Sequence, residues 1–251
     1  MNKIYKWFHQ WGSPPTFYKW SGQWLPWLTF FCVALFAIGL YGGLVYAPAD
    51  YQQKDSFRII YIHVPAAWMS MFVYLVMAIS GAIALIWHIK LSEIMMLSSA
   101  SIGASFTFIA LVTGSIWGKP TWGTWWEWGD ARLLSELMLL FLYIGIIGLY
   151  SAIEDKRKAA EAVSILALVG TVNIPIIHYS VIFVNTLHQG PTVSMFDSPS
   201  IDTRMLIPLL IMALAFKLFY GIVLLMRSRN ELLWRERRSQ WVKNIIKGDG
   251  T

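Results

Sequence analysis

Residues 64–87, VPAAWMSMFVYLVMAISGAIALIW, decide the fold, because this long apolar stretch contains no Asp, Glu, Lys or Arg. About 20 mostly apolar residues are enough for an α-helix to cross the hydrocarbon core of a bilayer. Further apolar stretches of comparable length lie on both sides of it, at 24–46, 94–116, 132–151, 162–184 and 205–226. The sequence therefore predicts an all-α integral membrane protein, with one domain of six transmembrane helices over residues 1–251.

The composition of the whole chain excludes a soluble fold. Hydrophobic residues make up 57% of the 251 residues and charged residues only 14%, whereas a soluble domain is about 25% charged. So few charges cannot cover the apolar surface of a chain of this size. The single cysteine, Cys32, lies in an apolar stretch, so neither a disulfide framework nor a Cys-based metal site is expected.

The distribution of Lys and Arg predicts the orientation, because cytoplasmic segments carry an excess of both. With the N-terminus in the cytoplasm, most basic residues fall on the inner side, including Lys90 and the run from Lys156 to Lys158. The outer loops, at 47–63, 117–131 and 185–204, and their edges then hold only Lys54, Arg58, Lys119, Arg132 and Arg204. Both termini are therefore expected to be cytoplasmic.

The net charge of +6 does not indicate a nucleic-acid partner. The surplus lies at the inner membrane edge, where Lys and Arg fix the topology and meet anionic lipid of the bilayer. The tail at 227–251 is expected to form an amphipathic helix on that surface, with docking on a cytoplasmic partner as the alternative. Ala47-Pro48-Ala49 resembles a signal-peptide cleavage site, but the preceding apolar run is longer than the 7–15 residues of a signal sequence. We therefore expect an uncleaved first span.

Residues 117–132, WGKPTWGTWWEWGDAR, form the most unusual segment of the chain. Tryptophan favours the headgroup depth, which explains scattered residues such as Trp24 and Trp234. It does not explain so many indoles in one outer loop, where Gly118 and Gly123 permit turns and Pro120 restricts the chain. Adjacent indoles can form a flat apolar platform for a large planar conjugated ligand. The platform residues are Trp117, Trp122, Trp125, Trp126 and Trp128.

Two of the five histidines share the depth of this loop. His63 lies where the first outer loop enters the second span, and His188 lies just after the fifth span. His9 and His88 are on the inner side, and His178, inside the fifth span, is interpreted as a packed polar residue bonded to a neighbour. Neutral imidazole is a common iron ligand, and haem combines a need for axial donors with a flat apolar face. His63 and His188 are therefore candidate axial ligands of haem iron.

Haem propionates would also need cationic or N–H partners. A helix that begins at 132 would direct its first N–H groups toward an anion, and the Arg132 guanidinium could bind a carboxylate through two hydrogen bonds. Asp130 is a candidate N-cap of that helix. The other cations on the outer side are Lys119, Arg58 and Arg204, and the residues alone do not choose among them.

Several segments carry a resemblance to a known family. They are 47–53 (APADYQQ), 61–67 (YIHVPAA), 106–115 (FTFIALVTGS), 117–120 (WGKP), 122–126 (WGTWW), 173–180 (NIPIIHYS) and 185–190 (NTLHQG). From about Pro14 to the cytoplasmic tail, the chain resembles the CcmC family of tryptophan-rich haem-handling membrane proteins, which act in cytochrome c maturation.

The resemblance implies a six-helix protein of the bacterial inner membrane that is not an enzyme and that binds haem b as cargo on its periplasmic side. The axial histidines of the family fall on His63 and His188, and its tryptophan motif falls on 122–128. The resemblance also implies partners: the ATPase and membrane subunits of an ABC transporter, a small single-span accessory subunit, and a membrane-anchored haem chaperone that receives the haem.

One departure from the family pattern concerns Asp130. Gly129 separates Trp128 from Asp130, and Leu134 stands where the family usually has Thr. One inserted residue before a helix turns the preceding side chains by about 100°. Either Gly129 is absorbed as a bulge, or Asp130 lies away from its usual place.

Two other classes of protein were weighed. An electron-transfer membrane cytochrome would usually hold its histidine ligands inside the spans, whereas His63 and His188 lie at loop boundaries. A secondary transporter would show interrupted helices in repeated halves and a site at the midplane, and the sequence has no apparent repeat. The spans contain few ionisable residues, chiefly Glu136 and His178, which argues against a polar conduit.

Overall fold

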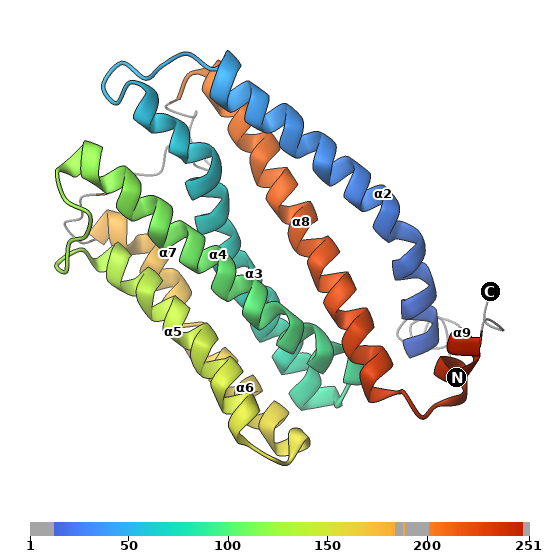
Figure 1. Cartoon of the computed structure of the whole chain (residues 1–251). Helices are drawn as coiled ribbons and strands as arrows, with labels where there is room; N and C mark the ends of the chain where they lie inside the picture. The colour runs from blue at the N-terminus through green and yellow to red at the C-terminus, as the bar shows by residue number, and fades with distance from the viewer. Residues whose placement is uncertain (1–12, 184–187, 189–200, 248–251) are drawn as a thin grey trace, which may run out of the picture.

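The computed structural model describes residues 13–183, 188 and 201–247 (Figure 1). Six helical segments in these ranges are long and apolar enough to cross a membrane, which confirms the predicted fold class. Their bounds are Pro14–Tyr46, Asp55–Trp87, Lys90–Trp122, Ala131–Ala152, Lys156–Ser180 and Thr203–Arg235. Each of the six predicted spans falls largely within one of these segments.

The described residues form ten helical elements in chain order. They are α2 (Pro14–Tyr41), the one-turn π-helix η1 (Gly42–Tyr46), the 3₁₀ turn η2 (Asp55–Ile59), α3 (Ile60–Trp87), α4 (Lys90–Trp122), α5 (Ala131–Ala152), α6 (Lys156–Gly170), α7 (Asn173–Phe183), α8 (Thr203–Arg235) and α9 (Gln240–Lys247).

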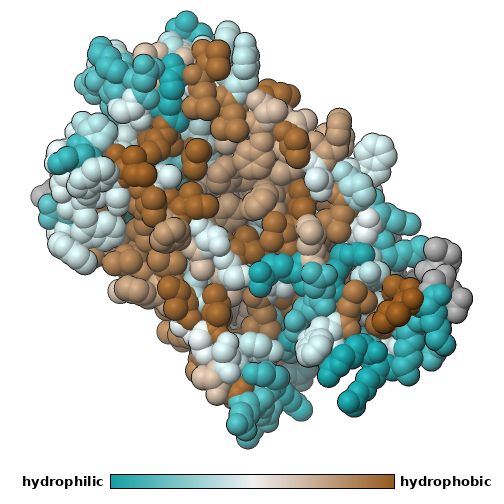
Figure 2. Space-filling view, in the orientation of Figure 1, coloured by the Kyte–Doolittle hydropathy of each residue, from teal (hydrophilic) through white to brown (hydrophobic). Residues whose placement is uncertain are grey.

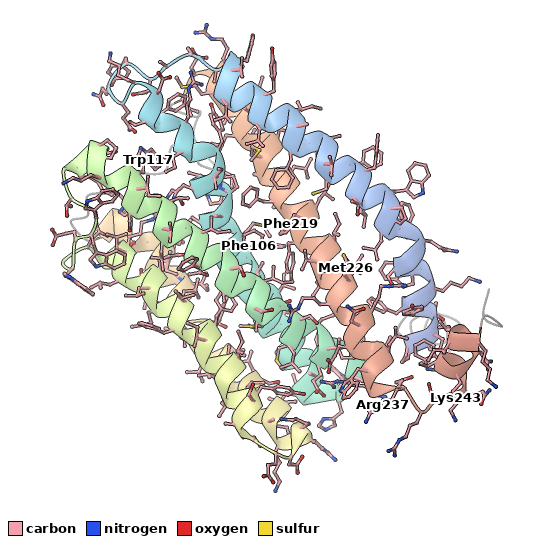
Figure 3. All side chains as sticks on the ribbon, in the orientation of Figure 1. Phe106, Trp117, Phe219, Met226, Arg237 and Lys243 are labelled. Atoms are coloured by element: carbon pink, nitrogen blue, oxygen red, sulfur yellow. The ribbon has the colours of Figure 1, made fainter. Side chains whose placement is uncertain are left out.

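Helices α3 and α4 form the centre of the bundle. They pack against each other and against α8, while α5 and α6 cover the other side and α2 lies along α8 (Figure 1). Between α4 and α8, the rings of Phe106 and Phe219 meet edge-on with centroids 6.3 Å apart (Figure 3). Apolar side chains dominate the middle of the visible face and polar ones gather at the two ends, as a lipid-facing surface requires (Figure 2).

The two ends of the bundle carry different elements. The start of α2, the α3–α4 and α5–α6 turns, and α9 lie at one end, which we call the tail end (Figure 1). The loop between η1 and η2, the end of α4 and the starts of α5 and α8 lie at the other, which we call the loop end. Trp117 lies toward the loop end, and Arg237 and Lys243 lie at the tail end (Figure 3).

Helix α4 extends into the segment that the sequence predicted as a loop. It continues to Trp122 and ends at Gly123, whose φ of 82° is the left-handed conformation that favours glycine. The Gly123 N–H donates to the Lys119 carbonyl at 3.1 Å, and the Lys119 ammonium donates to the Gly123 carbonyl at 3.0 Å. Trp117 and Trp122 are therefore helical, and the loop contains only residues 123–130.

The fifth span is broken between α6 and α7. Pro175 has no N–H, and its ring would clash with the carbonyl of residue 171 in a continuous helix. The Asn173 amide donates to the Ser135 carbonyl of α5 at 2.9 Å, so this side of α7 faces the bundle. His178 lies about 140° around the helix from Asn173. His178 is exposed, and its ring meets that of the adjacent Tyr179 edge-on with centroids 4.8 Å apart, which corrects its interpretation as a packed residue.

Helix α8 continues to Arg235, beyond the expected end of the last span at 226. No Gly or Pro interrupts residues 222–235, and its charged side chains bind neighbouring helices. The Arg229 guanidinium lies 3.8 Å from the centre of the Tyr18 ring of α2. The Arg235 guanidinium donates to Glu93 of α4 at 2.7 Å. The first part of the expected surface tail is therefore packed helix, and α9 is the separate tail helix.

Candidate functional site

His63 lies one turn into α3, against α4. Its Nδ1 atom lies 3.1 Å from the Ala110 carbonyl and 3.1 Å from the Thr113 hydroxyl oxygen. The carbonyl can only accept, and the Thr113 hydroxyl already donates to the Ile109 carbonyl at 2.6 Å. These contacts place the proton of neutral His63 on Nδ1, so that Nε2 carries the lone pair needed for a metal.

Glycine at position 114 lets α4 approach the His63 ring. A Cβ atom at Gly114 would lie 3.0 Å from Cε1 of His63, closer than ordinary packing allows. The Trp117 indole, one turn further along α4, meets the same imidazole edge-on with ring centroids 5.6 Å apart. Its Nε1–H donates to the Gln53 side chain at 2.7 Å, which ties α4 to the loop between η1 and η2.

His188 lies against the start of α5 and the end of α4. Its Nδ1 atom is 3.5 Å from the Asp130 carboxylate, and its ring centroid is 4.8 Å from that of Trp122. The other Asp130 carboxylate oxygen accepts the backbone N–H groups of Arg132 and Leu133, so Asp130 is the N-cap of α5. The buried Asp130 carboxylate thus both caps α5 and orients His188.

Burial and the positive charge of Arg132 lower the pKa of His188, while the Asp130 carboxylate opposes this shift. The neutral form of the imidazole is therefore favoured at neutral pH. With the Nδ1–H directed at Asp130, the lone pair of neutral His188 is on Nε2.

Arg132 connects the two histidines. Its charge interacts electrostatically with both imidazoles, and His63 and His188 also interact with each other. Among the described residues, its guanidinium makes no hydrogen bond or salt bridge to another side chain. Glu136 and Asp130 act on its charge electrostatically without a hydrogen bond, so its N–H groups are available for a ligand carboxylate.

The other predicted cations are used differently. Arg58 pairs with Asp55 at 2.9 Å and donates to the Gly43 carbonyl at 2.7 Å, which joins η2 to η1. Lys119 caps α4 through the Gly123 carbonyl. Arg204 pairs with Asp202 at 2.9 Å beside the start of α8. Of the four candidates, only Arg132 interacts with the two histidines.

The five indoles divide into two groups. Trp117 and Trp122 project from α4 and contact one histidine each. Trp125, Trp126 and Trp128 lie in the loop, where Trp126 and Trp128 meet with ring centroids 5.6 Å apart. Trp125 and Trp128 are 56% and 71% exposed. The expected platform on one loop is thus corrected to a helical pair beside the histidines and three indoles in the loop that follows, of which Trp126 is half-buried.

Two imidazoles with lone pairs on Nε2, two indole faces and one available guanidinium fit a planar metal macrocycle that carries carboxylates. Comparisons with known proteins agree on a single family. Residues 7–243 match the family model described as Heme exporter protein C. The chain belongs to the Heme exporter protein C family.

The relatives of this family span bacteria and a plant. A Heme exporter protein C of Escherichia coli K12 is 50% identical over 243 residues, which cover 97% of this chain and 98% of the relative. One from Haemophilus influenzae is 48% identical over 242 residues, covering 96% and 98%. A Marchantia polymorpha protein named putative cytochrome c biosynthesis ccmC-like mitochondrial protein is 43% identical over 212 residues, covering 84% and 90%.

The geometry resolves the question raised by Gly129 in this member of the Heme exporter protein C family. The Gly129 N–H donates to the Glu127 carboxylate at 3.2 Å, and the Asp130 N–H donates to the Glu127 carbonyl at 3.2 Å. The inserted residue is absorbed in this turn. Asp130 still caps α5 and faces His188.

Sequence reasoning missed several residues around the histidines. The Ala110 carbonyl is a backbone group, so no side-chain pattern marks it. Thr113 and Gly114 lie one turn apart from Ala110 and Trp117 on α4, and this helical spacing is the signal that could have linked them to the site. Gln53 belongs to a segment that carries the family resemblance, but its contact with Trp117 depends on how the first outer loop folds.

Proposed function

We propose that this chain binds haem b at the outer, periplasmic surface of the bacterial inner membrane and delivers it during the maturation of c-type cytochromes. His63 and His188 serve as axial ligands, and Arg132 binds a propionate. The names of the relatives support haem handling and cytochrome c biogenesis. The observation that carries the axial assignment is that both histidines direct Nδ1 at a protein acceptor.

The arrangement of the indoles supports a relay rather than permanent storage. Trp117 and Trp122 contact the histidines from α4, so they can cover the haem near its iron. Trp125 and Trp128 are exposed and extend this apolar surface away from the bundle. Haem that lies against these indoles keeps its apolar faces out of water and still has one open side for a recipient.

Transfer requires partners, because the described residues leave no soluble domain beside the site. We propose that a membrane-anchored haem chaperone approaches over the exposed indoles and receives haem when one axial histidine is released. The ATPase and membrane subunits of an ABC transporter and a small single-span subunit complete the assembly. No chemical step is assigned to the chain itself, so it is not an enzyme in this proposal.

The test is haem absorbance of the purified protein in detergent. His63→Ala and His188→Ala should each lose the Soret band of bound haem, and added imidazole should restore part of it by filling the vacated ligand position. His178→Ala is the matched control, because His178 is exposed on α7 and should leave the spectrum unchanged. Wild-type spectra and wild-type transfer in both alanine variants would disprove the axial assignment.

The indole surface is tested separately. Trp125→Leu combined with Trp126→Leu keeps the apolar character and removes the stacking faces, so haem retention should fall. Unchanged retention would return these indoles to a membrane-anchoring role. Transfer of haem to a purified chaperone supports the relay, whereas stable reversible reduction by a quinol without transfer would indicate an electron-transfer cytochrome.

A further inference from the structure

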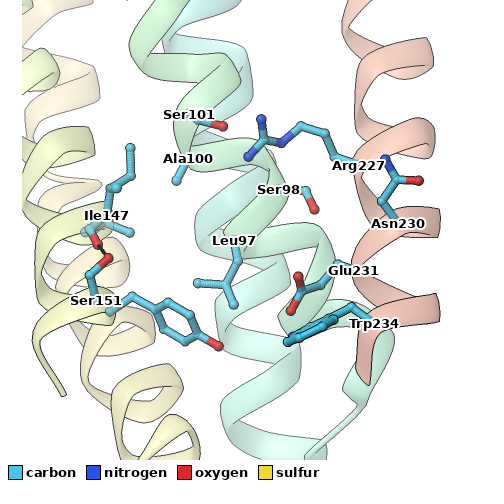
Figure 4. A pocket seen from close by; sticks show the side chains of 12 residues that line it. Leu97, Ser98, Ala100, Ser101, Ile147, Ser151, Arg227, Asn230, Glu231 and Trp234 are labelled. Carbon is cyan, nitrogen blue, oxygen red and sulfur yellow. Dashed lines mark hydrogen bonds between the residues drawn. The ribbon is translucent and has the colours of Figure 1, made fainter. Parts of the chain in front are cut away.

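A cavity lies far from the histidines, at the tail end of the bundle. It has a volume of about 550 Å³ and is bounded by α4, α5 and α8 (Figure 4). Its apolar wall includes Leu97, Ala100, Ile146 and Ile147. Its polar side includes Ser101, Tyr150, Ser151, Arg227, Asn230 and Glu231. None of these residues takes part in the proposed haem site.

The charged and the apolar parts of this cavity lie on different helices. Arg227 is about 36 Å along α8 from Thr203, which exceeds the ~30 Å thickness of the hydrocarbon core. Arg227 and Glu231 are therefore at headgroup depth. The apolar side chains come from the other two helices, Leu97 and Ala100 from α4 and Ile146 and Ile147 from α5. The cavity thus joins charged side chains to an apolar wall, the two kinds of surface that a lipid contacts.

The polar end presents one charge of each sign to a ligand. Within the described part of the chain, Arg227 makes no hydrogen bond or salt bridge. Glu231 and Glu93 share a single guanidinium, that of Arg235, at 2.6 and 2.7 Å. Two carboxylates on one cation leave one negative charge in excess, and Glu231 is the member of the pair that lines the cavity.

A buried polar atom in the same wall also lacks a partner. The Ser101 hydroxyl oxygen is inaccessible to solvent and has no hydrogen-bond partner among the described residues. Burying an unpaired hydroxyl costs free energy. Figure 4 shows Ser101 and Arg227 toward the same part of the cavity.

We propose that this cavity binds a phospholipid of the adjacent leaflet whose headgroup contains both a phosphate and a primary ammonium. The phosphate is recognised by Arg227 and Asn230, the ammonium by Glu231, and an acyl chain lies along Ile146 and Ile147. A headgroup with a phosphate alone would leave the excess charge of Glu231 uncompensated. Free phosphate would leave the apolar wall uncovered.

The experiment uses the full chain, purified in neutral detergent and freed of lipid, with binding followed by native mass spectrometry. Phosphatidylethanolamine and phosphatidylglycerol with identical acyl chains are titrated separately, and inorganic phosphate is a third probe. Wild-type protein should retain phosphatidylethanolamine more strongly than phosphatidylglycerol and should not retain phosphate. Arg227→Gln should weaken binding of both lipids by about tenfold, as expected for loss of one charge-assisted hydrogen bond.

Two further variants test the contact with the ammonium group and the contact with the acyl chain separately. Glu231→Gln should remove the preference for phosphatidylethanolamine while binding of phosphatidylglycerol persists. Glu231 also forms an ion pair with Arg235, so an independent variant is needed. Ile147→Trp fills the apolar part of the cavity from an exposed position and should weaken the binding of both lipids. Arg238→Gln, an exposed cation outside the cavity, is the matched control and should bind as wild type.

Equal or tighter binding of phosphatidylglycerol in the wild type overturns the proposal, as does unchanged lipid binding in Arg227→Gln. Retention of phosphate as strong as that of lipid also overturns it. If Arg227→Gln leaves lipid binding unchanged and instead reduces co-purification of a transmembrane partner, the cavity is a protein contact. The haem spectrum of each variant should remain that of wild type, so failure here is distinguishable from failure of the haem proposal.

Discussion

His63 and His188 are oriented by different kinds of acceptor, and this difference determines how each can be perturbed. A backbone carbonyl and a hydroxyl hold His63, whereas a carboxylate that also caps a helix faces His188. Acceptors behind a metal-binding histidine fix the ring and increase its basicity. Substitutions of these partners should therefore alter haem binding without changing either proposed ligand.

Asp130→Asn is the sharpest of these substitutions. Asparagine is as good an N-cap as aspartate, so α5 should remain capped while His188 loses its charged acceptor. We expect haem affinity to fall by about 10- to 100-fold, the usual effect of removing such a partner, with little change in thermal stability. Haem titration and thermal unfolding measure the two effects separately.

Asp130→Ala is the comparison for this prediction. It removes the cap as well and should cost about 1 kcal/mol of stability in addition to the loss of affinity. Equal haem affinity in the wild type and Asp130→Asn would show that the carboxylate acts only as a helix cap.

Gly114→Val tests the close packing of α4 on His63. The added side chain would begin 3.0 Å from Cε1 of the imidazole and extend toward it, so the ring must move away from the Ala110 carbonyl. We expect a shifted or weakened Soret band in a protein that still folds. Gly148→Ala is the control, because no heavy atom lies within 4 Å of a Cβ at that position. A wild-type spectrum in Gly114→Val would show that His63 tolerates displacement.

Residue patterns singled out His63 and His188 as candidates because both are side chains at a common depth, and they left Arg132 as one of four candidate cations. They could not identify the acceptors, because the Ala110 carbonyl belongs to the backbone and Gln53 reaches Trp117 across 64 positions of the chain. The residue pattern also could not predict which indoles contact the histidines. This contact depends on whether Trp117 and Trp122 are helical, and that is decided by where α4 ends.

At the scale of elements, helix ends were the least predictable feature. Hydropathy located each apolar core, but α4 and α8 continue through polar residues whose partners lie on other helices. In α8, the Arg229 side chain donates a hydrogen bond to Ser21 of α2, and the Arg235 side chain donates one to Glu93 of α4. Residues with the composition of a solvated tail are therefore packed against the bundle. Local sequence cannot anticipate such partners, because they exist only once the bundle has formed.

The docking of α9 should depend on pH through Glu236. Burial acts to raise the pKa of Glu236, but hydrogen bonds from Lys90 and Trp241 outweigh it and hold the pKa below its ordinary value of 4.5. A carboxyl with a lowered pKa stabilises the docked state fully above 4.5, and the contribution is lost as the pH falls through the lowered pKa. We expect α9 to loosen in that acidic range.

The mobility of a spin label at Lys247→Cys in a Cys32→Ala background measures this loosening. Mobility should rise on acidification below 4.5 in the parent chain. With Glu236→Gln added, it should already be high at neutral pH, since the charged partner is absent throughout. A parent spectrum that stays unchanged as the pH falls well below 4.5 would contradict the assignment of α9 docking to Glu236.

At the scale of the whole molecule, the two ends have separate chemistry. The loop end contains both candidate ligands, Arg132 and the indoles, whereas the tail end contains the cavity with Arg227 and Glu231. Because the number of spans is even, the start of α2 and the end of α9 lie at the same end of the bundle (Figure 1). The surplus of Lys and Arg predicts that this end faces the cytoplasm.

Cysteine labelling tests this orientation directly. With Cys32→Ala as background, Tyr51→Cys introduces a thiol at the loop end, where Tyr51 is 80% exposed, and Lys158→Cys introduces one at the exposed start of α6. A membrane-impermeant maleimide added to spheroplasts should modify Tyr51→Cys at once and Lys158→Cys only after lysis. The reverse pattern would place His63 and His188 in the cytoplasm. Haem binding between them would then survive, but delivery to a periplasmic chaperone would not, because the donor and recipient would be on opposite sides of the membrane.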